Sequence, residues 1–219
     1  MRWVVMILLA IPATSVAAWG DVLWFEDNFE GADLDTTVWE VGAHGASGIS
    51  VDGGWLYIEA DQDGNMPRVL LRTDVVPFPP GDFKIEFRSE YLVVHDWGCG
   101  GVVNHEDTPE GNWWGCWQGT TVRLRMQLLG QVVWQTPEVD VDPHVFACVR
   151  EGQTLTAYVD GEQAGSSTTE LLPQLLYFGH RPYESGSWTT FRVDYVRIWD
   201  LGPTAAKDST WSSIKALYR

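Results

Sequence analysis

The chain has 219 residues and a formal net charge of −16, with 30 Asp and Glu against 14 Lys and Arg. Such an acidic chain repels a phosphate backbone, which excludes nucleic-acid binding through a basic footprint and docking on an anionic lipid surface. Apolar residues make up 45% of the chain, enough for a packed core, and its 13 Trp give it an unusual content of flat, partly polar rings. This composition predicts one folded domain, with or without an appendage.

The first 18 residues have the pattern of a secretory signal peptide. Arg2 supplies a positive charge, residues 3–11 form an apolar run too short to span a bilayer, and the small residues that follow allow cleavage after Ala17 or Ala18. No later stretch approaches ~18 consecutive apolar residues. We therefore expect an exported protein with no transmembrane segment after signal cleavage, secreted or at the cell surface, with the periplasm as a further possibility.

Export places the cysteines in an oxidising compartment, where one disulfide can persist. Cys99, Cys116 and Cys148 allow three single pairings and leave one thiol over. Cys99 and Cys116 lie in Gly- and Trp-rich segments, whereas Cys148 lies in the apolar stretch 144–151. We favour a Cys99–Cys116 disulfide with Cys148 as a buried thiol, because the cysteine spacings fit no zinc site.

The body of the chain, from Trp24 to Asp200, consists of short alternating runs separated by Gly, Pro, Asp and Asn. Each run reads as a strand with one buried and one wet face. The predicted strands are 55–60, 68–73, 83–94, 121–129, 144–151, 155–161, 175–179 and 190–200. Asp160-Gly161 predicts a tight hairpin turn. No segment keeps a helical period over three turns, so the sequence predicts an all-β sandwich or barrel.

Residues 203–219 differ in kind from the body. Ser209 or Thr210 offers a cap for a short helix, and three basic residues against one Asp make this tail basic on an acidic body. We expect a short C-terminal helical tail that either packs on the sandwich or serves as a terminal tag for a surface or secretion partner. The chain then divides into a signal peptide at 1–18, a domain at 19–202 and a tail at 203–219.

Three stretches of the body share the order and spacing of motifs in a known group of proteins. FEDNFEGADLDTTVWEV (25–41) opens the body, VDGGWLYIEA (51–60) follows, and FRVDYVRIWD (191–200) closes it. Over residues 24–200 the chain resembles the concanavalin A-like lectin/glucanase superfamily, which includes laminin-G-like domains and the family-sixteen glycoside hydrolases. The resemblance implies a jelly-roll β-sandwich of two antiparallel sheets, with the ligand site usually on the concave face.

The closing stretch carries two further expectations. Its apolar phase slips, which predicts a bulge near Asp194-Tyr195. The resemblance also implies a structural Ca²⁺ held by Asp194 and by the backbone carbonyls of Asn28 and Gly54. Calcium prefers ~6–8 hard oxygen ligands, which a carboxylate, carbonyls and waters can supply. The alternative is that Asp194 only bonds backbone N–H groups and pins the two ends of the domain together.

The hydrolases of this superfamily carry a Glu-x-Asp-x-Glu strand motif that this sequence lacks. Where the motif should fall, Glu106 and Glu110 stand among Gly and Pro in a stretch that looks like a loop. Glu86 and Glu90 share one face of a predicted strand with Arg88, the pattern of a solvated charge ladder. Because these are the nearest substitutes for a catalytic pair, the sequence argues against an enzyme.

Aromatic side chains in loop-like stretches favour sugar binding, because flat rings can receive the apolar faces of pyranoses. Two adjacent Trp in an extended chain cannot both point into the core. The ligand candidates are Trp97, Trp113, Trp114, Trp117, Tyr183 and Trp188, with Arg123 and Arg125 for hydroxyls or a uronic acid carboxylate. Core packing is the alternative for each ring, and we assume it for Trp24, Trp39, Trp55, Trp134 and Trp199.

Together these features predict a secreted, lectin-like domain that binds an extracellular polysaccharide or glycoconjugate without catalysis. The alternatives are a diverged glycoside hydrolase and a structural or adhesive cell-surface protein that uses the tail as an attachment.

Overall fold

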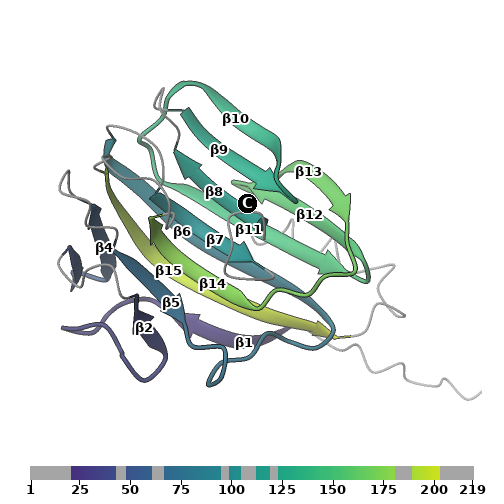
Figure 1. Cartoon of the computed structure of the whole chain (residues 1–219), viewed down its shortest axis with the longest axis horizontal. Helices are drawn as coiled ribbons and strands as arrows, with labels where there is room; N and C mark the ends of the chain where they lie inside the picture. Colours follow the sequence, from purple (N-terminus) through teal and green to yellow (C-terminus); the bar gives the residue numbers. More distant parts are fainter. Residues whose placement is uncertain are drawn as a thin grey trace, which may run out of the picture.

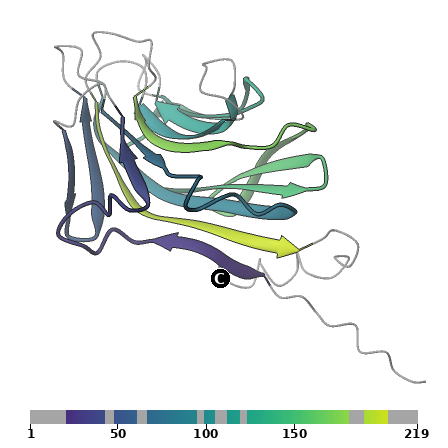
Figure 2. The same ribbon diagram turned by 60° about the horizontal axis from the view of Figure 1, so that its bottom comes forward.

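The computed structural model describes residues 21–42, 48–60, 67–94, 99–104, 112–118, 123–180 and 189–202. These residues form two antiparallel sheets that stack as layers (Figures 1 and 2). The all-β jelly-roll sandwich predicted from the sequence is confirmed for this part of the chain. The predicted helical tail at 203–219 and the predicted signal peptide at 1–18 lie outside the described residues.

Sheet A has eight strands, in the order β13-β12-β11-β6-β15-β4-β3, with β1 also paired to β15. Their bounds are β1 Val22–Asp27, β3 Ile49–Asp52, β4 Trp55–Ala60, β6 Asp82–Val94, β11 His144–Glu151, β12 Thr154–Val159, β13 Glu162–Thr168 and β15 Thr189–Gly202.

Sheet B has seven strands, in the order β10-β9-β8-β7-β14-β5-β2. Their bounds are β2 Trp39–Val41, β5 Arg68–Leu71, β7 Cys99–Asn104, β8 Asn112–Gln118, β9 Arg123–Leu128, β10 Gln131–Val139 and β14 Leu175–His180. Strand β8 therefore lies near the middle of sheet B, between β7 and β9.

The last strand, β15, joins the two ends of the domain. One edge of β15 pairs with β6 along most of its length, and the other edge pairs with β4 and then with β1. The register with β6 shifts between Val193 and Tyr195, so the predicted bulge is confirmed. Phe191 and Val193 point into the core before the shift, and Val196 points into it after the shift. This change of phase explains the slip in the apolar pattern of the sequence.

Alternation decides which residues of β6 face the core. Phe83, Ile85 and Phe87 are fully buried between the sheets, while Lys84 and Glu86 lie on the other face of the strand. The ring of Phe87 packs so tightly against β7 that a Cβ on Gly101 would lie 2.4 Å from its Cζ. A glycine is therefore required where the two sheets approach each other at this point.

Two local predictions are confirmed and one is wrong. Asp160 and Gly161 have φ values of 50° and 81° and link β12 to β13, as a tight hairpin turn requires. Cys148 is a free, buried cysteine, and burial raises the pKa of its thiol. The stretch after β6 that looked like a loop instead contains β7 and β8. Its Gly and Trp content hid these strands, because Gly is rare in strands.

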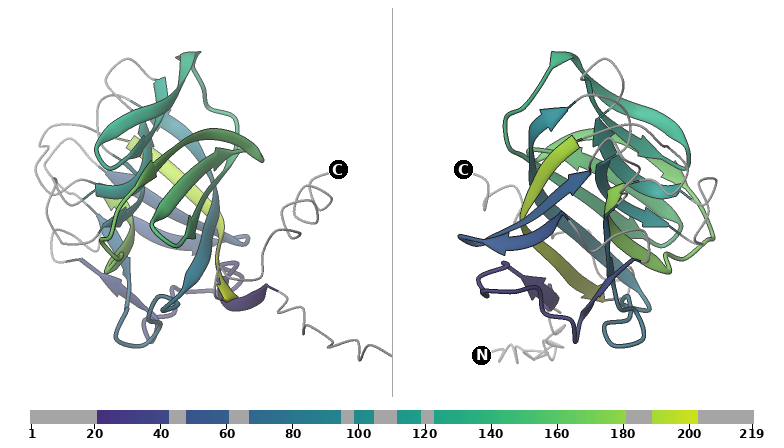
Figure 3. Two further views of the ribbon diagram at one scale, coloured as in Figure 1. Left: turned by 90° about the vertical axis from the view of Figure 1, so that its right-hand side faces the viewer. Right: turned by 60° about the vertical axis from the view of Figure 1, so that its left-hand side comes forward.

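The tryptophans expected in the core divide into three groups. Trp39 is buried and contacts Phe178, as expected, and Trp134 is partly buried against the core. Trp24 is 41% exposed, so its assignment to the core is wrong. Trp55 and Trp199 are half-buried outside the core, where arginine and lysine side chains cover them. Figure 3 gives two further views of the sandwich.

Candidate functional site

The outer face of sheet B, meaning the face turned away from the core, is built from two rows of residues in register. Residues next to them in each strand, such as Val69, Phe178 and Leu124, are buried in the core. Alternation therefore assigns the row positions to the outside. The arginine row consists of Arg68, Gly179, Gly100, Trp117 and Arg125. The tyrosine row consists of Leu70, Tyr177, Val102, Gly115 and Gln127.

Glycines occupy the central positions of both rows. Gly179 and Gly100 are neighbours in the arginine row, and Gly115 lies between Val102 and Gln127 in the tyrosine row. Gly179 has a φ of 137°, and a Cβ there would lie 2.4 Å from the carbonyl oxygen of Pro67, so a side chain is excluded at that position. A strand position without a side chain is typical of sites where another molecule or backbone approaches closely.

Arg68 and Tyr177 form the ordered polar end of this face. The Arg68 guanidinium carbon lies 5.3 Å from the centre of the Tyr177 ring, within range of a cation–π contact. Tyr177 and Val102 are buried and form a small cluster, against which Leu70 packs. The cation–π contact restricts the Arg68 side chain.

The central strands of sheet B are unusual for an acidic protein because they contain no carboxylate. β5, β14, β7, β8 and β9 carry no Asp or Glu, and their permanently charged residues are Arg68, Arg123 and Arg125. Strand β8 has the sequence NWWGCWQ, in which Gly115 stands two residues from Trp113 and two residues from Trp117. Hydrolysis of a glycosidic bond by paired carboxylates therefore has no candidate acids on these five strands.

The structure brings some predicted ligand residues to this face and removes one. Trp114 is fully buried and its ring centre lies 5.3 Å from that of Phe87, so its selection as a ligand residue is wrong. Arg125 is half-buried in the arginine row. Trp113, Trp117 and Arg123 have their backbones in β8 and β9, but their side chains lie outside the description, as do all of Trp97, Tyr183 and Trp188. No sequence pattern pointed to Arg68 or Tyr177, which only the register between the strands places here.

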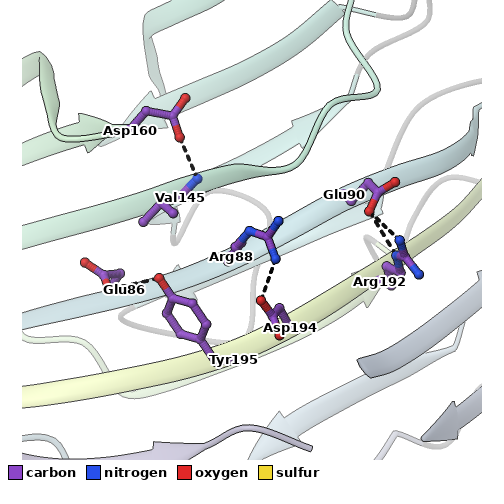
Figure 4. Close-up of polar contacts among 8 residues, drawn as sticks. All are labelled: Glu86, Arg88, Glu90, Val145, Asp160, Arg192, Asp194 and Tyr195. Carbon is purple, nitrogen blue, oxygen red and sulfur yellow. Dashed lines mark hydrogen bonds and ion pairs between the residues drawn. The ribbon is translucent and has the colours of Figure 1, made fainter. Parts of the chain in front are cut away.

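The outer face of sheet A has a different character, because its charges pair with one another (Figure 4). Arg88 donates to Asp194 at 2.6 Å, and both Nε and Nη2 of Arg192 donate to Glu90, at 3.0 and 2.7 Å. Arg197 donates to Glu26 at 2.6 Å. Three arginines on two strand pairings, β6 with β15 and β1 with β15, thus each have a carboxylate partner on a neighbouring strand.

Aromatic rings fill the spaces between these ion pairs. Arg192 lies over Trp55, with 4.0 Å between the guanidinium carbon and the ring centre, and Arg197 lies 4.2 Å from the centre of the Tyr195 ring. Burial, and next the nearby Glu86 carboxylate, raise the pKa of Tyr195, whose hydroxyl donates to Glu86 at 3.2 Å. The face is therefore a set of mutually satisfied charges and rings.

Glu86 and Glu90 are not arranged as a catalytic pair. They lie four residues apart on β6, which separates their backbones by ~13 Å along the strand, against the ~5–9.5 Å between carboxyls that glycoside hydrolysis requires. Glu86 is only 3% exposed and lies 2.5 Å from the Lys84 ammonium. The expectation of a solvated charge ladder is therefore wrong for Glu86, although the shared face is confirmed. Glu106 and Glu110 lie outside the described residues.

The predicted calcium ligand Asp194 lies where the strand pairing along one edge of β15 is interrupted. β4 pairs with β15 up to Val193 and β1 pairs with it from Val196, so Asp194 lies between the two pairings. The carbonyl oxygen of Asn28 lies 3.9 Å from where a Cβ on Gly54 would be. The backbones of Asn28 and Gly54 are therefore close to each other, and the Asp194 carboxylate is ion-paired with Arg88. The described residues include no group of three His, Cys, Asp or Glu side chains that could hold a metal ion.

The predicted disulfide would join two neighbouring strands of sheet B. Cys116 in β8 is opposite Gly101, and Cys99 in β7 is two residues away from that position. Such diagonal neighbours are ~7–8 Å apart, beyond the ~4.4–6.8 Å usual between the Cα atoms of a disulfide. The Cys99–Cys116 bond stays a prediction, because the side chains of both cysteines lie outside the described residues.

A hollow of about 560 Å³ lies at the end of the sandwich where β6 and β14 begin, away from both rows. Its lining is largely apolar and includes Pro77, Phe78 and Leu172. Strand β15 ends near its rim, because the carbonyl oxygen of Gly202 lies 3.8 Å from a Cβ position on Gly81. No converging polar groups mark the hollow as a site for chemistry.

Comparison with known proteins identifies the fold. No family model and no curated protein matches the sequence. The chain is similar in structure to the catalytic domain of an endo-1,3-β-glucanase (laminarinase) from Thermotoga petrophila RKU-1, with a TM-score of 0.62, 15% identity, and coverage of 83% of this chain and 98% of the other. An endo-β-1,3-glucanase from Pyrococcus furiosus gives a TM-score of 0.62 and 16% identity, covering 82% and 94%.

A third similar structure, from work on endo-acting O-glycanases of the human gut microbiota, gives a TM-score of 0.61 and 17% identity, covering 80% of this chain and 98% of the other. The protein therefore shares the jelly-roll fold of these structures, as its motifs indicated. Within the described part of the chain, no helix has the length and apolar character needed to cross a membrane.

Proposed function

We propose that this protein binds an extracellular glycan, without hydrolysing it, on the outer face of sheet B. The observation that carries the proposal is the composition of the five central strands, which combine aromatic residues, glycines and arginines but have no carboxylate. Rings and hydrogen-bond donors suit a sugar chain, whereas paired acids are what its hydrolysis needs. The glycan-acting proteins that share the fold support carbohydrate as the ligand class.

A glycan array read with intrinsic tryptophan fluorescence tests the proposal. We expect binding that Trp117→Ala and Trp113→Ala weaken at least tenfold, because stacked rings carry much of the contact with an extended ligand. Trp24→Ala is the matched control, since Trp24 is exposed on β1 of sheet A, away from the two rows. Thermal unfolding of each variant separates lost contact from lost folding. An array without binding, measured on a folded protein, contradicts the proposal and favours a structural or adhesive role.

A diverged glycoside hydrolase is the second candidate, which the fold of the laminarinases favours. Release of reducing sugar from β-glucans tests it directly. Activity that Glu106→Gln or Glu110→Gln abolishes, while Glu86→Gln leaves it intact, would establish this alternative and overturn a purely binding role. We expect no release, because the central strands lack the two acids.

We further propose a structural Ca²⁺ at the gap beside Asp194, held there with the carbonyls of Asn28 and Gly54. Its role is to tie β1 and β4 to the same edge of β15. A melting temperature that is higher in Ca²⁺ than in EDTA supports it, and equal melting temperatures reject it. In the second case Arg88 alone neutralises Asp194. The N-terminal 1–18 stretch supports export, and the 203–219 tail stays a candidate for a surface or secretion partner.

A further inference from the structure

We propose that the apolar hollow at the end of the sandwich is the docking site of the chain's own C-terminal tail, residues 203–219, whose apolar side chains fill it. The sequence of the tail allows two roles, packing on the sandwich or attachment to an outside partner, and docking in the hollow is the first of them. Docking does not depend on glycan binding, because the hollow lies away from both rows of sheet B.

The hollow suits an apolar, uncharged occupant. None of the described residues that line it carries a charge, and the lining comes mainly from residues 77–80 and 172–175. Pro77, Pro80 and Leu172 are exposed, so the hollow opens to solvent. Its volume of about 560 Å³ lies within the ~300–1,000 Å³ of pockets that hold ligands, which leaves room for several side chains.

Exposed apolar side chains gather around this hollow. Six of the nine large apolar side chains that are exposed in the described part of the chain lie in three segments at this end of the sandwich: Val22, Leu23, Trp24, Val75, Leu171 and Leu172. The indole N–H of Trp24 donates to the carbonyl oxygen of Pro77 at 2.7 Å, so the start of β1 borders the lining. Apolar surface gathered in this way marks a contact with another group, so we expect an occupant here.

The tail leaves the described structure beside the hollow. β15 ends at Gly202, whose carbonyl oxygen lies 3.8 Å from a Cβ position on Gly81, the residue after Pro80 of the lining. Figure 2 shows β15, in yellow, ending where β1, in purple, begins, and Asp200 is paired with Val22 there. The six residues 203–208 can span ~20 Å. A tether this short gives the tail a local concentration in the ~mM range, so weak apolar contacts suffice to dock it.

The sequence of the tail fits this site in shape and in charge. A helix that begins after Ser209 gathers its large apolar side chains in one stripe about 120° wide, formed by Trp211, Ile214, Leu217 and Tyr218. Lys215 and Arg219 fall outside this stripe, so docking the stripe leaves both charges in water. A basic tail is attracted to a domain rich in Asp and Glu, whereas a second copy of a chain with a net charge of −16 is repelled. The charges therefore favour the tail as the occupant.

Hydrogen–deuterium exchange on the full chain, read by mass spectrometry, tests the docking. We expect the amides of residues 210–219 to exchange at least about tenfold more slowly than in a free peptide of residues 203–219, because a helix this short is marginal in water unless it is packed. Leu172→Ser, at a lining position that is 50% exposed, and Trp211→Ala should each abolish this difference. Trp211→Ala should also speed exchange in residues 170–176 at the rim, while the strands of both sheets, which end by Gly202, keep their exchange rates.

Val132→Ser is the matched control, because Val132 is 48% exposed on β10, four strands away from β14. It should leave the protection of the tail unchanged, and thermal unfolding establishes that each variant is folded. Protection that survives Leu172→Ser overturns the hollow as the docking site. Protection that is lost on dilution means that the tail comes from a second copy, which overturns docking within one chain. A tail that exchanges as fast as the free peptide overturns docking altogether and leaves the tail to an outside partner.

Discussion

The two outer faces of this sandwich differ in the charged side chains that their strands carry. Sheet A places arginines beside carboxylates and rings, so that each charge has a partner from a neighbouring strand (Figure 4). Sheet B gives its central strands arginine, glycine and aromatic residues without an acid. A face whose charges neutralise each other gains stability from its own groups. We therefore expect substitutions on the outer face of sheet A to lower stability, and it is on sheet B that we propose the glycan binds.

The largest expected effect comes from Glu86→Ala. This substitution removes the carboxylate from the nearly buried Lys84 and from the hydroxyl of Tyr195. Breaking a buried ion pair by removing one partner costs about 3 kcal/mol or more of unfolding free energy, measured by urea denaturation. Glu59→Ala, at an exposed position in β4, should cost far less. Equal losses for the two variants would contradict the stabilising role given to sheet A.

Gly101→Ala should have the next largest effect, because its Cβ would enter the ring of Phe87. The two sheets must then separate at their closest approach, at a cost of about 1–3 kcal/mol of unfolding free energy. Gly81→Ala is the control, since the nearest atom to its added Cβ would be 3.8 Å away. A Gly101→Ala protein with unchanged stability in urea would show that the sheets lie farther apart here.

Arg197→Gln sharpens the comparison at the surface. The ion pair between Arg197 and Glu26 is partly exposed, and such pairs contribute about 0–1 kcal/mol. A double-mutant cycle with Glu26→Gln measures the coupling by urea denaturation, and glycan affinity should not change. A large change in affinity would mean that sheet A also takes part in binding.

His144→Gln should give the smallest effect, and one that depends on pH. The hydrogen bond with Asp160 raises the pKa of His144, burial opposes this rise, and Asp140 adds to it. A raised pKa stabilises the fold below the unfolded value of ~6.5, and the contribution is lost as pH rises through the folded pKa. Wild type should therefore exceed the variant in stability by more at about pH 5.5 than at about pH 8.5. A pH-independent difference would contradict the charged pairing.

Local patterns in the sequence predicted much of the fold. Alternation in 83–88 located the strand whose phenylalanines fill the core, and the phase slip at Asp194-Tyr195 located the bulge in β15. Asp160-Gly161 located a hairpin, because a tight turn needs positive φ at both residues. Each of these signals is local, since it depends on a few consecutive residues.

The sequence predicted the candidate site only in part, because the site depends on contacts between residues that are far apart along the chain. Strand β8 has the composition of a loop, and it becomes a strand through pairing with β7 and β9. Nothing in the sequence distinguishes the buried Trp114 from an exposed tryptophan. Its ring lies on the core face of β8, where it packs against Phe87. The sequence by itself determined the all-β sandwich, the motifs that open and close it, and the net charge. Only the tertiary structure decided that Arg68 and Arg125, far apart along the chain, share one row, because register between strands is set by long-range hydrogen bonding that no local pattern encodes.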